Sequence, residues 1–202
     1  MDNIPEFFKY GITPKLSILL HGDPGTGKST FAKALAKYLK IDSVLNVPPM
    51  FFSPDCKDRI RSYSQKVINI DDIDCVCEAR KDNKSQENMN KVAELLDFLD
   101  NPPTFNFKAK DGLYYPISIV VASTNYYDKL DKAVKRHGRF DLTIELKYFN
   151  KKEAKEFCKI YDLRLEDVYK GKINDDFNIS PAELQALCLE NINKSLKNTI
   201  EF

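Results

Sequence analysis

Neither a strong net charge nor a long apolar run is present in this chain. Its 202 residues include 31 basic and 30 acidic side chains, so no global electrostatic field attracts nucleic acid, and a charged partner must bind at a local site. The apolar runs are far shorter than the roughly 20 residues that cross a bilayer, and the first residues lack the basic and apolar regions of a signal peptide. With 43% apolar and 30% charged residues, we expect a soluble, cytoplasmic globular protein.

Cysteine and histidine are also scarce. Of the five cysteines only Cys75 and Cys77 are close together, and neither His21 nor His137 is near them in the sequence. A structural zinc site usually draws its four ligands from closely spaced pairs of such residues. We therefore expect free thiols rather than a zinc centre.

Glycine is rare as well, yet three of the seven glycines fall within six positions. They belong to Gly22-Asp23-Pro24-Gly25-Thr26-Gly27-Lys28-Ser29, a complete G-x-x-x-x-G-K-S/T phosphate loop. In such a loop the glycines allow backbone N–H groups to surround the phosphates, while Lys28 reaches the β and γ oxygens and Ser29 binds Mg²⁺. The residues expected to contact a nucleoside triphosphate are Gly22, Asp23, Pro24, Gly25, Thr26, Gly27, Lys28, Ser29 and Thr30.

The residues around the loop predict the strand, loop and helix order that this motif needs. Residues 16–20 form an apolar run typical of a buried strand, and residues 28–39 carry apolar side chains at helical spacing. Further strand candidates alternate with helical patterns, which predicts an α/β fold with a parallel five-stranded sheet flanked by helices. These candidates are 44–47, 67–70, 117–123 and 142–146.

A helix and a β-hairpin are predicted before the strand at 117–123. Residues 89–99 have one apolar helical face, which we interpret as part of the core. Pro102-Pro103 ends this helix, and residues 105–115 then predict a hairpin with its turn at Asp111-Gly112. The hairpin is either a plain surface element or a contact for a substrate.

The end of the chain has a helical pattern. Asn150 with Glu153, and Ser180 with Glu183, can each form an N-terminal capping box. We therefore expect a small helical lid behind the α/β core. The predicted domains are residues 1–149 for the core and residues 150–202 for the lid.

Two strand ends carry polar residues suited to nucleotide hydrolysis. Asp71 and Asp72 follow one strand; the first acid can hold Mg²⁺ through water, and the second can orient or deprotonate the attacking water. Asn125 follows another strand, and its amide can bond the γ-phosphate or the same water. Open α/β sheets bind ligands at the carboxyl ends of their strands. Because aspartate is one methylene shorter than the glutamate common at the second acidic position, hydrolysis is expected to be slow or to use a shifted water.

Two arginines flank a glycine in the segment 136–141, which begins 11 residues after Asn125. A planar guanidinium suits the charge of a phosphate in its transition state, so Arg136 and Arg139 can complete the site of a neighbouring subunit. Taken by itself, however, an exposed basic turn explains this segment better.

Together these segments resemble the AAA family of ATPases over about residues 4–149. The motifs of that family correspond, in order, to residues 23–29, 71–72, 123–125 and 136–141. The resemblance implies a homo-oligomeric ring, a hexamer or a heptamer formed with ATP, that uses ATP and Mg²⁺ to remodel or move a macromolecular partner. It implies catalytic roles for Lys28, Asp72, Asn125, Arg136 and Arg139, and Mg²⁺ binding by Ser29 and Asp71.

Within the family the chain looks most like the branch of the mitochondrial chaperone that assembles the Rieske iron–sulfur protein. The likeness rests on residues 7–12, 48–66 and 125–131, and that branch also has aspartate at the second acidic position. Its membrane anchor and middle domain are not found in this sequence. No aromatic-glycine pore loop is evident, although Met50-Phe51-Phe52 can stand in for one.

Two other interpretations stay open. The acidic pair, the hairpin with Lys108 and Lys110, and the Ser-Thr-Asn strand end also resemble viral superfamily 3 helicases, in which such a hairpin touches nucleic acid. A slow-turnover, ATP-gated switch is the other alternative. The compactness of the chain fits a viral or minimal version of the fold.

We expect Lys28→Ala to bind MgATP roughly 30-fold more weakly than the wild type, because the change removes a charge-assisted contact worth about 2 kcal/mol. Isothermal titration calorimetry measures the dissociation constant. Wild-type affinity in this variant would contradict the assignment of the phosphate loop.

Overall fold

The computed structural model describes residues 4–49, 58, 60, 67–77 and 86–200. Within these, only the backbone is described for residues 86–89 and 194–200. The chain divides into two compact units. The first comprises residues 1–22 and 28–145, and the second comprises residues 23–27 and 146–202. The candidate pore segment Met50-Phe51-Phe52 lies outside the described residues.

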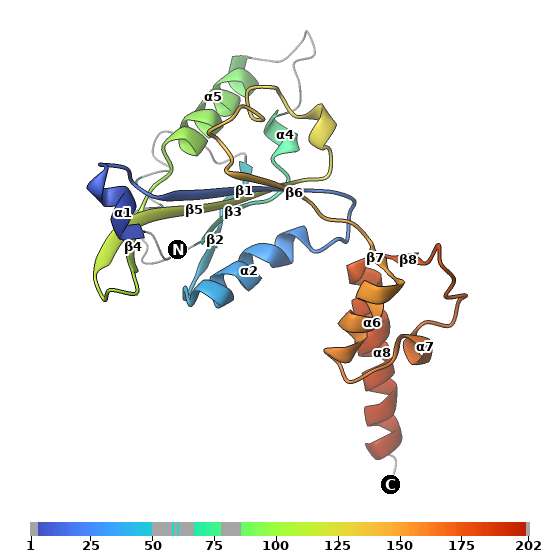
Figure 1. Ribbon diagram of the computed structural model, residues 1–202. Helices are drawn as coiled ribbons and strands as arrows, with labels where there is room; N and C mark the ends of the chain where they lie inside the picture. The colour runs from blue at the N-terminus through green and yellow to red at the C-terminus, as the bar shows by residue number, and fades with distance from the viewer. Residues whose placement is uncertain (1–3, 50–57, 59, 61–66, 78–85, 201–202) are drawn as a thin grey trace. The chain divides into compact units, whose positions relative to one another are not determined.

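A parallel sheet forms the centre of the first unit (Figure 1). Five of its strands lie in the order β2-β3-β5-β1-β6, in which every neighbouring pair is parallel, and a sixth strand, β4 (Phe105–Lys108), pairs antiparallel with β5. The bounds are Lys15–His21 for β1, Val44–Asn46 for β2, Val67–Ile70 for β3, Tyr114–Thr124 for β5 and Leu142–Glu145 for β6. The five predicted strands and the α/β class are therefore confirmed.

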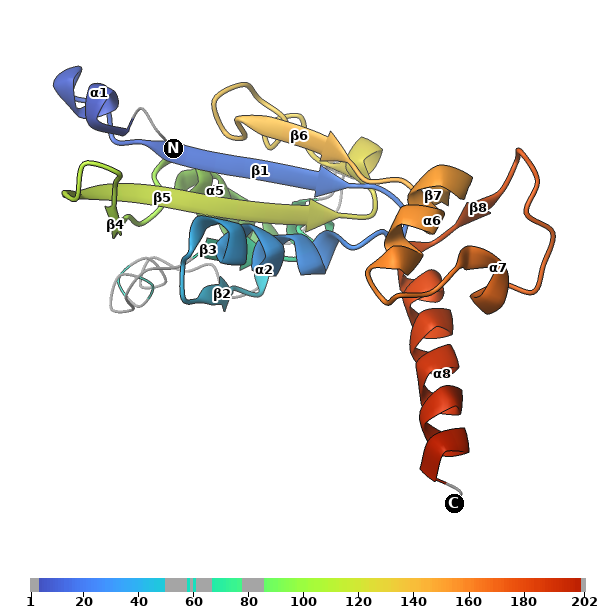
Figure 2. The same ribbon diagram turned by 60° about the horizontal axis from the view of Figure 1, so that its bottom comes forward.

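Strand β5 lies between β3 and β1, and residues 117–124 of it are all buried. Helices cover both faces of such a sheet, so its central strands read as continuous apolar runs. Figure 2 shows β1 and β5 side by side along their length, in a register that runs from Lys15 opposite Ser118 to His21 opposite Thr124. The ends of these two strands therefore coincide.

Helices pack on both faces of this sheet. Figure 1 shows α2 on one face, and α4 and α5 on the other. Their bounds are Lys28–Leu39 for α2, Asp74–Cys77 for α4 and Gln86–Asp100 for α5. Leu95, Phe98 and Leu99 of α5 are buried in the main apolar cluster, so the predicted core face of this helix is confirmed. A single 3₁₀ turn, Tyr127–Lys129, follows β5.

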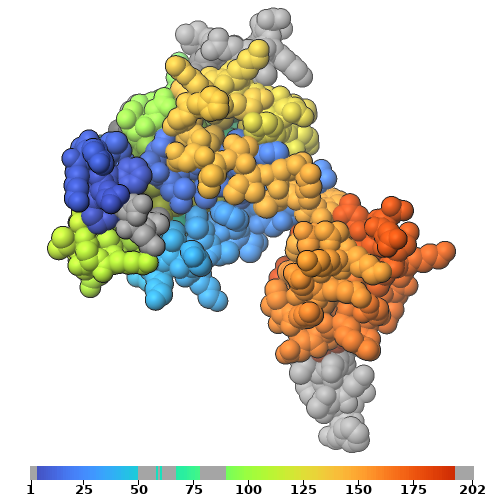
Figure 3. Space-filling view, in the orientation of Figure 1, coloured from blue at the N-terminus to red at the C-terminus, as the bar shows by residue number. Residues whose placement is uncertain are grey.

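The predicted hairpin is present, and its second strand is the beginning of β5. Strand β4, Phe105–Lys108, pairs antiparallel with residues 114–117, and Gly112 supplies the turn with a φ of 83°. On its second strand the centroid of the Tyr115 ring lies 5.1 Å from that of the Phe8 ring of α1, Ile4–Lys9. The atoms of α1 and of the hairpin accordingly lie next to each other on the surface (Figure 3).

Helices α6, α7 and α8, with a short antiparallel ladder of β7 and β8, make up most of the second unit. A separate apolar cluster holds them together, with Cys158, Leu184 and Cys188 fully buried. The bounds are Phe149–Asn150 for β7, Lys151–Lys159 for α6, Leu165–Val168 for α7, Asn178–Ile179 for β8 and Pro181–Ile200 for α8.

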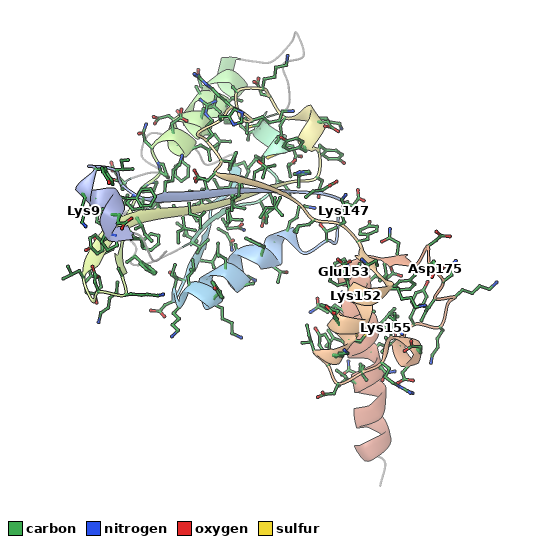
Figure 4. The ribbon with its side chains drawn as sticks, in the orientation of Figure 1. Lys9, Lys147, Lys152, Glu153, Lys155 and Asp175 are labelled. Atoms are coloured by element: carbon green, nitrogen blue, oxygen red, sulfur yellow. The ribbon has the colours of Figure 1, made fainter. Side chains whose placement is uncertain are left out.

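Helices α6 and α8 of this unit begin at the capping residues that the sequence predicted. Asn150 and Glu153 form the predicted capping box of α6, in which each side chain accepts a hydrogen bond from the other residue's backbone N–H. At the start of α8 the Ser180 hydroxyl accepts a hydrogen bond from the backbone N–H of Glu183 at 3.1 Å. Lys155 of α6, labelled in Figure 4, forms an ion pair of 2.8 Å with Glu166 of α7.

The described cysteines differ in accessibility, which gives a direct test of the second core. Burial and the neighbouring Cys188 raise the pKa of Cys158 to about 12, so its thiol stays protonated in mildly alkaline buffer. Cys75 has a raised pKa as well, through burial and the charge of Asp74, but it is exposed. We expect a maleimide to label Cys75 in the native protein and Cys158 and Cys188 only after unfolding, as read by peptide mass spectrometry. Equal labelling rates at Cys75 and Cys158 in the native protein would contradict the packing of this core.

Candidate nucleotide-binding site

The phosphate loop directly follows β1, and α2 begins at its lysine. Gly22, Gly25 and Gly27 all have positive φ values, 137°, 80° and 94°, which suit glycine and turn the backbone N–H groups of the loop inward. The Lys28 ammonium donates a hydrogen bond of 2.7 Å to the carbonyl of Gly22. Ser29 is exposed beside it in the first turn of α2. A phosphate here would meet the positive end of a helix dipole.

The middle of the loop belongs to the second unit. The buried Thr26 hydroxyl donates to the carbonyl of Asp23 at 2.8 Å, which closes the turn. The backbone N–H of Ala182 donates to the carbonyl of Gly25 at 3.0 Å, so the first turn of α8 contacts the loop. Asp23 and Pro24 are exposed, as is Thr30 of the first unit.

The first acid, Asp71, is held in a fixed orientation at the end of β3. One of its carboxylate oxygens accepts a hydrogen bond of 2.7 Å from the Ser123 hydroxyl, and the other accepts one of 3.0 Å from the Asn69 amide. Ser123 and Asn69 are both buried in the sheet. Their hydrogen bonds orient the carboxylate and leave its negative charge in place. A charged oxygen of this kind is a suitable ligand for a hard cation.

The number of oxygen ligands near Asp71 suits Mg²⁺ bound together with a nucleotide. No group of three or more histidine, cysteine, aspartate or glutamate side chains that could hold a metal ion occurs among the described residues. Mg²⁺ at nucleotide sites is held by one or two protein oxygens, with phosphates and water completing an octahedron. Asp71 and the Ser29 hydroxyl are donors of this kind.

The second acid, Asp72, has an unusual backbone and an unusual charge environment. Its φ is 54°, in the left-handed region that few residues other than glycine, asparagine and aspartate enter. The Asn125 amide nitrogen lies 3.4 Å from one of its carboxylate oxygens. Partial desolvation and the charges of Asp74 and Asp71 raise the pKa of Asp72, while Lys28 opposes the rise. A carboxylate with a raised pKa beside a lysine is a typical base of a catalytic site.

Strand register explains why these groups meet. Strand β5 aligns Thr124 with His21 of β1 and Ala122 with Ile70 of β3. The residues that follow the three strands therefore emerge at one edge of the sheet, and they include the phosphate loop, the acidic pair and Asn125.

A third acid, Asp74, holds the segment that carries Asn125. The Thr124 hydroxyl donates to the buried Asp74 carboxylate at 2.5 Å, and the same hydroxyl accepts a hydrogen bond of 2.9 Å from the backbone N–H of Tyr126. These two contacts fix the chain on both sides of Asn125. The sequence motifs did not predict this positioning role, although an acid two residues beyond the acidic pair was a visible signal.

The two arginines lie apart from this edge and differ from each other. Arg136 is exposed, whereas the Arg139 side chain is only 12% exposed and forms an ion pair of 3.0 Å with Asp100 at the end of α5. The carbonyl of Arg139 also contacts the ammonium of Lys15, the first residue of β1. Since β1 spans about 20 Å between Lys15 and His21, Arg139 lies at the opposite end of this strand from the phosphate loop.

Comparisons with known proteins agree with this geometry. Residues 18–148 match the model of the ATPase family associated with various cellular activities (AAA). The chain is 30% identical to the Cell division cycle protein 48 homolog of Archaeoglobus fulgidus, in an alignment that covers 97% of this chain and 27% of that protein. It is 32% identical to AAA-ATPase At3g28600 of Arabidopsis thaliana, covering 98% of this chain and 43% of the relative.

A further relative is 26S protease regulatory subunit 6A of Caenorhabditis elegans, which is 30% identical over 94% of this chain and 46% of its own length. The chain thus spans between about a quarter and a half of the length of these curated relatives. In the part of the chain that the structure describes, no helix is long and apolar enough to cross a membrane. The match to the family model covers well over half of the sequence, and the chain belongs to the AAA family of ATPases.

Proposed function

We propose that this chain is a Mg²⁺-dependent ATP hydrolase that works as a homo-oligomeric ring, a hexamer or a heptamer assembled with ATP, and that it remodels or moves a macromolecular partner. The observation that carries this proposal is the separation along β1. The phosphate loop, Asp72 and Asn125 lie beyond one end of the strand, while Arg139 is held at the other end. Among the described residues of the first unit, Arg136 and Arg139 both lie away from the chain's own phosphate loop, and a neighbouring copy can supply an arginine there.

The proposed roles follow the geometry of each side chain. Lys28 and the loop N–H groups bind the phosphates, and Ser29 and Asp71 would hold Mg²⁺, which would neutralise phosphate charge when bound. Asp72 accepts the proton of the attacking water, and Asn125, whose amide nitrogen lies 3.4 Å from the Asp72 carboxylate, orients that water. An arginine from the next protomer stabilises the charge that develops on the transferred phosphoryl group.

The finer assignments are also part of this proposal. Residues 1–149 act as the ATPase core and residues 150–202 as its lid. Residues 7–12 and 125–131 support a place near the branch of the Rieske-protein assembly chaperone. A cytoplasmic setting is part of the proposal as well.

A second candidate function is movement along nucleic acid, which the hairpin favours. Lys108 lies on it, and Leu113 and Tyr114 at its tip are exposed. Such a surface can combine phosphate contacts with base stacking. Binding of single-stranded DNA or RNA that weakens steeply with salt would favour this function, because phosphate contacts release counterions.

Light scattering with and without a slowly hydrolysed ATP analogue tests the ring independently of the partner.

We expect Asp72→Asn to bind MgATP with wild-type affinity but to lose nearly all turnover. The amide keeps the shape of the side chain and tolerates the left-handed backbone, but it cannot accept the proton. Phosphate release measures turnover, and calorimetry measures affinity. Asp42→Asn, at an exposed residue before β2, is the matched control and should hydrolyse ATP as the wild type does. If Asp72→Asn hydrolyses ATP at the wild-type rate, the base is another group, with Asp74 the first to examine.

We expect Thr124→Val to lower kcat by roughly tenfold to a hundredfold, because Asn125 loses the contacts that hold its segment in place. The dissociation constant for ATP should change by less than about twofold, since the phosphate loop is untouched. Thr124→Ser keeps the hydroxyl and should retain most of the activity. Equal kcat values for the valine and serine variants would show that the contact between Thr124 and Asp74 does not position Asn125.

A further inference from the structure

The arginine segment before β6 is fastened to the rest of its unit through Arg139. The guanidinium of Arg139 makes two parallel hydrogen bonds of 3.0 Å to the two carboxylate oxygens of Asp100, and a third to the carbonyl of Ala133. Two parallel bonds of this kind fix the plane of both groups as well as their distance. The pairing also joins residues that are 39 positions apart in the sequence.

Lys15 fastens the same segment from the first residue of β1. Its ammonium donates to the carbonyls of Gly138 at 2.9 Å, Leu99 at 3.1 Å and Arg139 at 3.4 Å. These three acceptors use the full donor capacity of an ammonium group. The Leu99 carbonyl is in the last turn of α5, where backbone carbonyls lack partners within the helix. Lys15 therefore ties the end of α5 to the turn between the two arginines.

A third attachment fixes where the segment ends. The backbone N–H of Ser17 donates to the Asp141 carboxylate at 2.7 Å, and the backbone N–H of Asp141 donates to the carbonyl of Ser17 at 2.8 Å. Strand β6 begins at the next residue and pairs with Ile18. The segment between Ala133 and Asp141 is thus held on both sides.

Arg136 occupies the exposed part of this fastened segment. Its backbone N–H donates to the carbonyl of Ala133, and its own carbonyl accepts from the N–H of Arg139, both at 3.3 Å. The turn is completed by Gly138, which has a φ of 92°. The side chains therefore differ in environment, since Arg139 is mostly buried against Asp100 and Arg136 is exposed.

We propose that the two arginines have different roles. Arg136 alone reaches the γ-phosphate of the neighbouring protomer, while Arg139, Asp100 and Lys15 are positioning residues that hold the Arg136 turn in place. This inference rests on the proposed function, in which an arginine acts in trans. It departs from the expectation that both arginines reach across the boundary, because Arg139 would have to leave three hydrogen bonds to do so.

The test compares three single variants, Arg136→Gln, Arg139→Gln and Asp100→Asn. Asp100 touches no nucleotide in this proposal, yet we expect all three variants to lower kcat by roughly tenfold to a hundredfold through a lost or displaced Arg136. The dissociation constant for ATP should stay within about twofold of wild type in each. Asp42→Asn, which removes one carboxylate from an exposed position of the same unit, should keep the wild-type kcat.

A mixing experiment separates positioning from general damage to the fold. Asp100→Asn chains keep an intact Asp72, and Asp72→Asn chains keep an intact arginine segment. A mixed ring therefore contains interfaces at which both are present, and we expect hydrolysis to rise above that of either variant alone. Lys15→Met, which removes the second attachment through a different element, should behave in the same way. It also serves if Asp100→Asn does not fold.

Two results would overturn the inference, and they differ in what they leave standing. If Asp100→Asn, or Lys15→Met in its place, hydrolyses ATP at the wild-type rate while Arg139→Gln does not, Arg139 acts directly and the positioning role is wrong, but the proposed function survives. If Arg136→Gln keeps the wild-type rate, Arg136 is not the group that acts in trans, and the ring mechanism loses its support as well.

Discussion

The backbone pairing of β5 with both β1 and β3 is the constraint on which the candidate site depends. A different part of the site follows each strand: the phosphate loop follows β1, the acidic pair follows β3, and the Asn125 segment follows β5. Because the three strands are parallel and end within a residue or two of one another, these elements emerge at one edge of the sheet. A shift of one residue in either register would turn the end residues to the opposite face of the sheet.

Burial of the polar side chains behind this edge costs free energy, and their hydrogen bonds within the sheet offset that cost. Asn69, Ser123, Thr124 and Asp74 are buried where apolar side chains would pack more favourably, and each makes at least one hydrogen bond to a partner at the site. The raised pKa of Asp72 means that the folded state binds its proton more tightly than the unfolded state does. Ionisation of Asp72 therefore lowers stability, and the loss grows as the pH rises from the ordinary aspartate pKa through the raised one. Such local penalties are typical of functional sites.

At the other end of β1, too, the residues that hold a segment in place differ from the residue that we expect to act on the nucleotide. Lys15 and Asp141 attach the segment to the strand, and Asp100 attaches it to α5. A single strand thus holds the phosphate loop at one end and, at the other, the residues we assign to a neighbouring site. In a closed ring this would make each protomer both the owner of one site and a contributor to the next, so that activity would depend on assembly.

The sequence by itself determined the features that local patterns encode. The spacing of residues 22–29, the apolar runs of the five strands and the capping residues Asn150 and Ser180 each act over a few positions, so strand, loop and helix were predictable. Only the tertiary structure decided which side chains meet across long separations. Ser123 reaches Asp71 over 52 positions, Thr124 reaches Asp74 over 50, and Arg139 reaches Asp100 over 39. The hairpin was predicted but not its continuity with β5, and the contacts through which Asp74, Asn69 and Lys15 hold the site and the arginine segment were not predicted. No local pattern reveals these contacts, because strand order and register create them when the sheet forms.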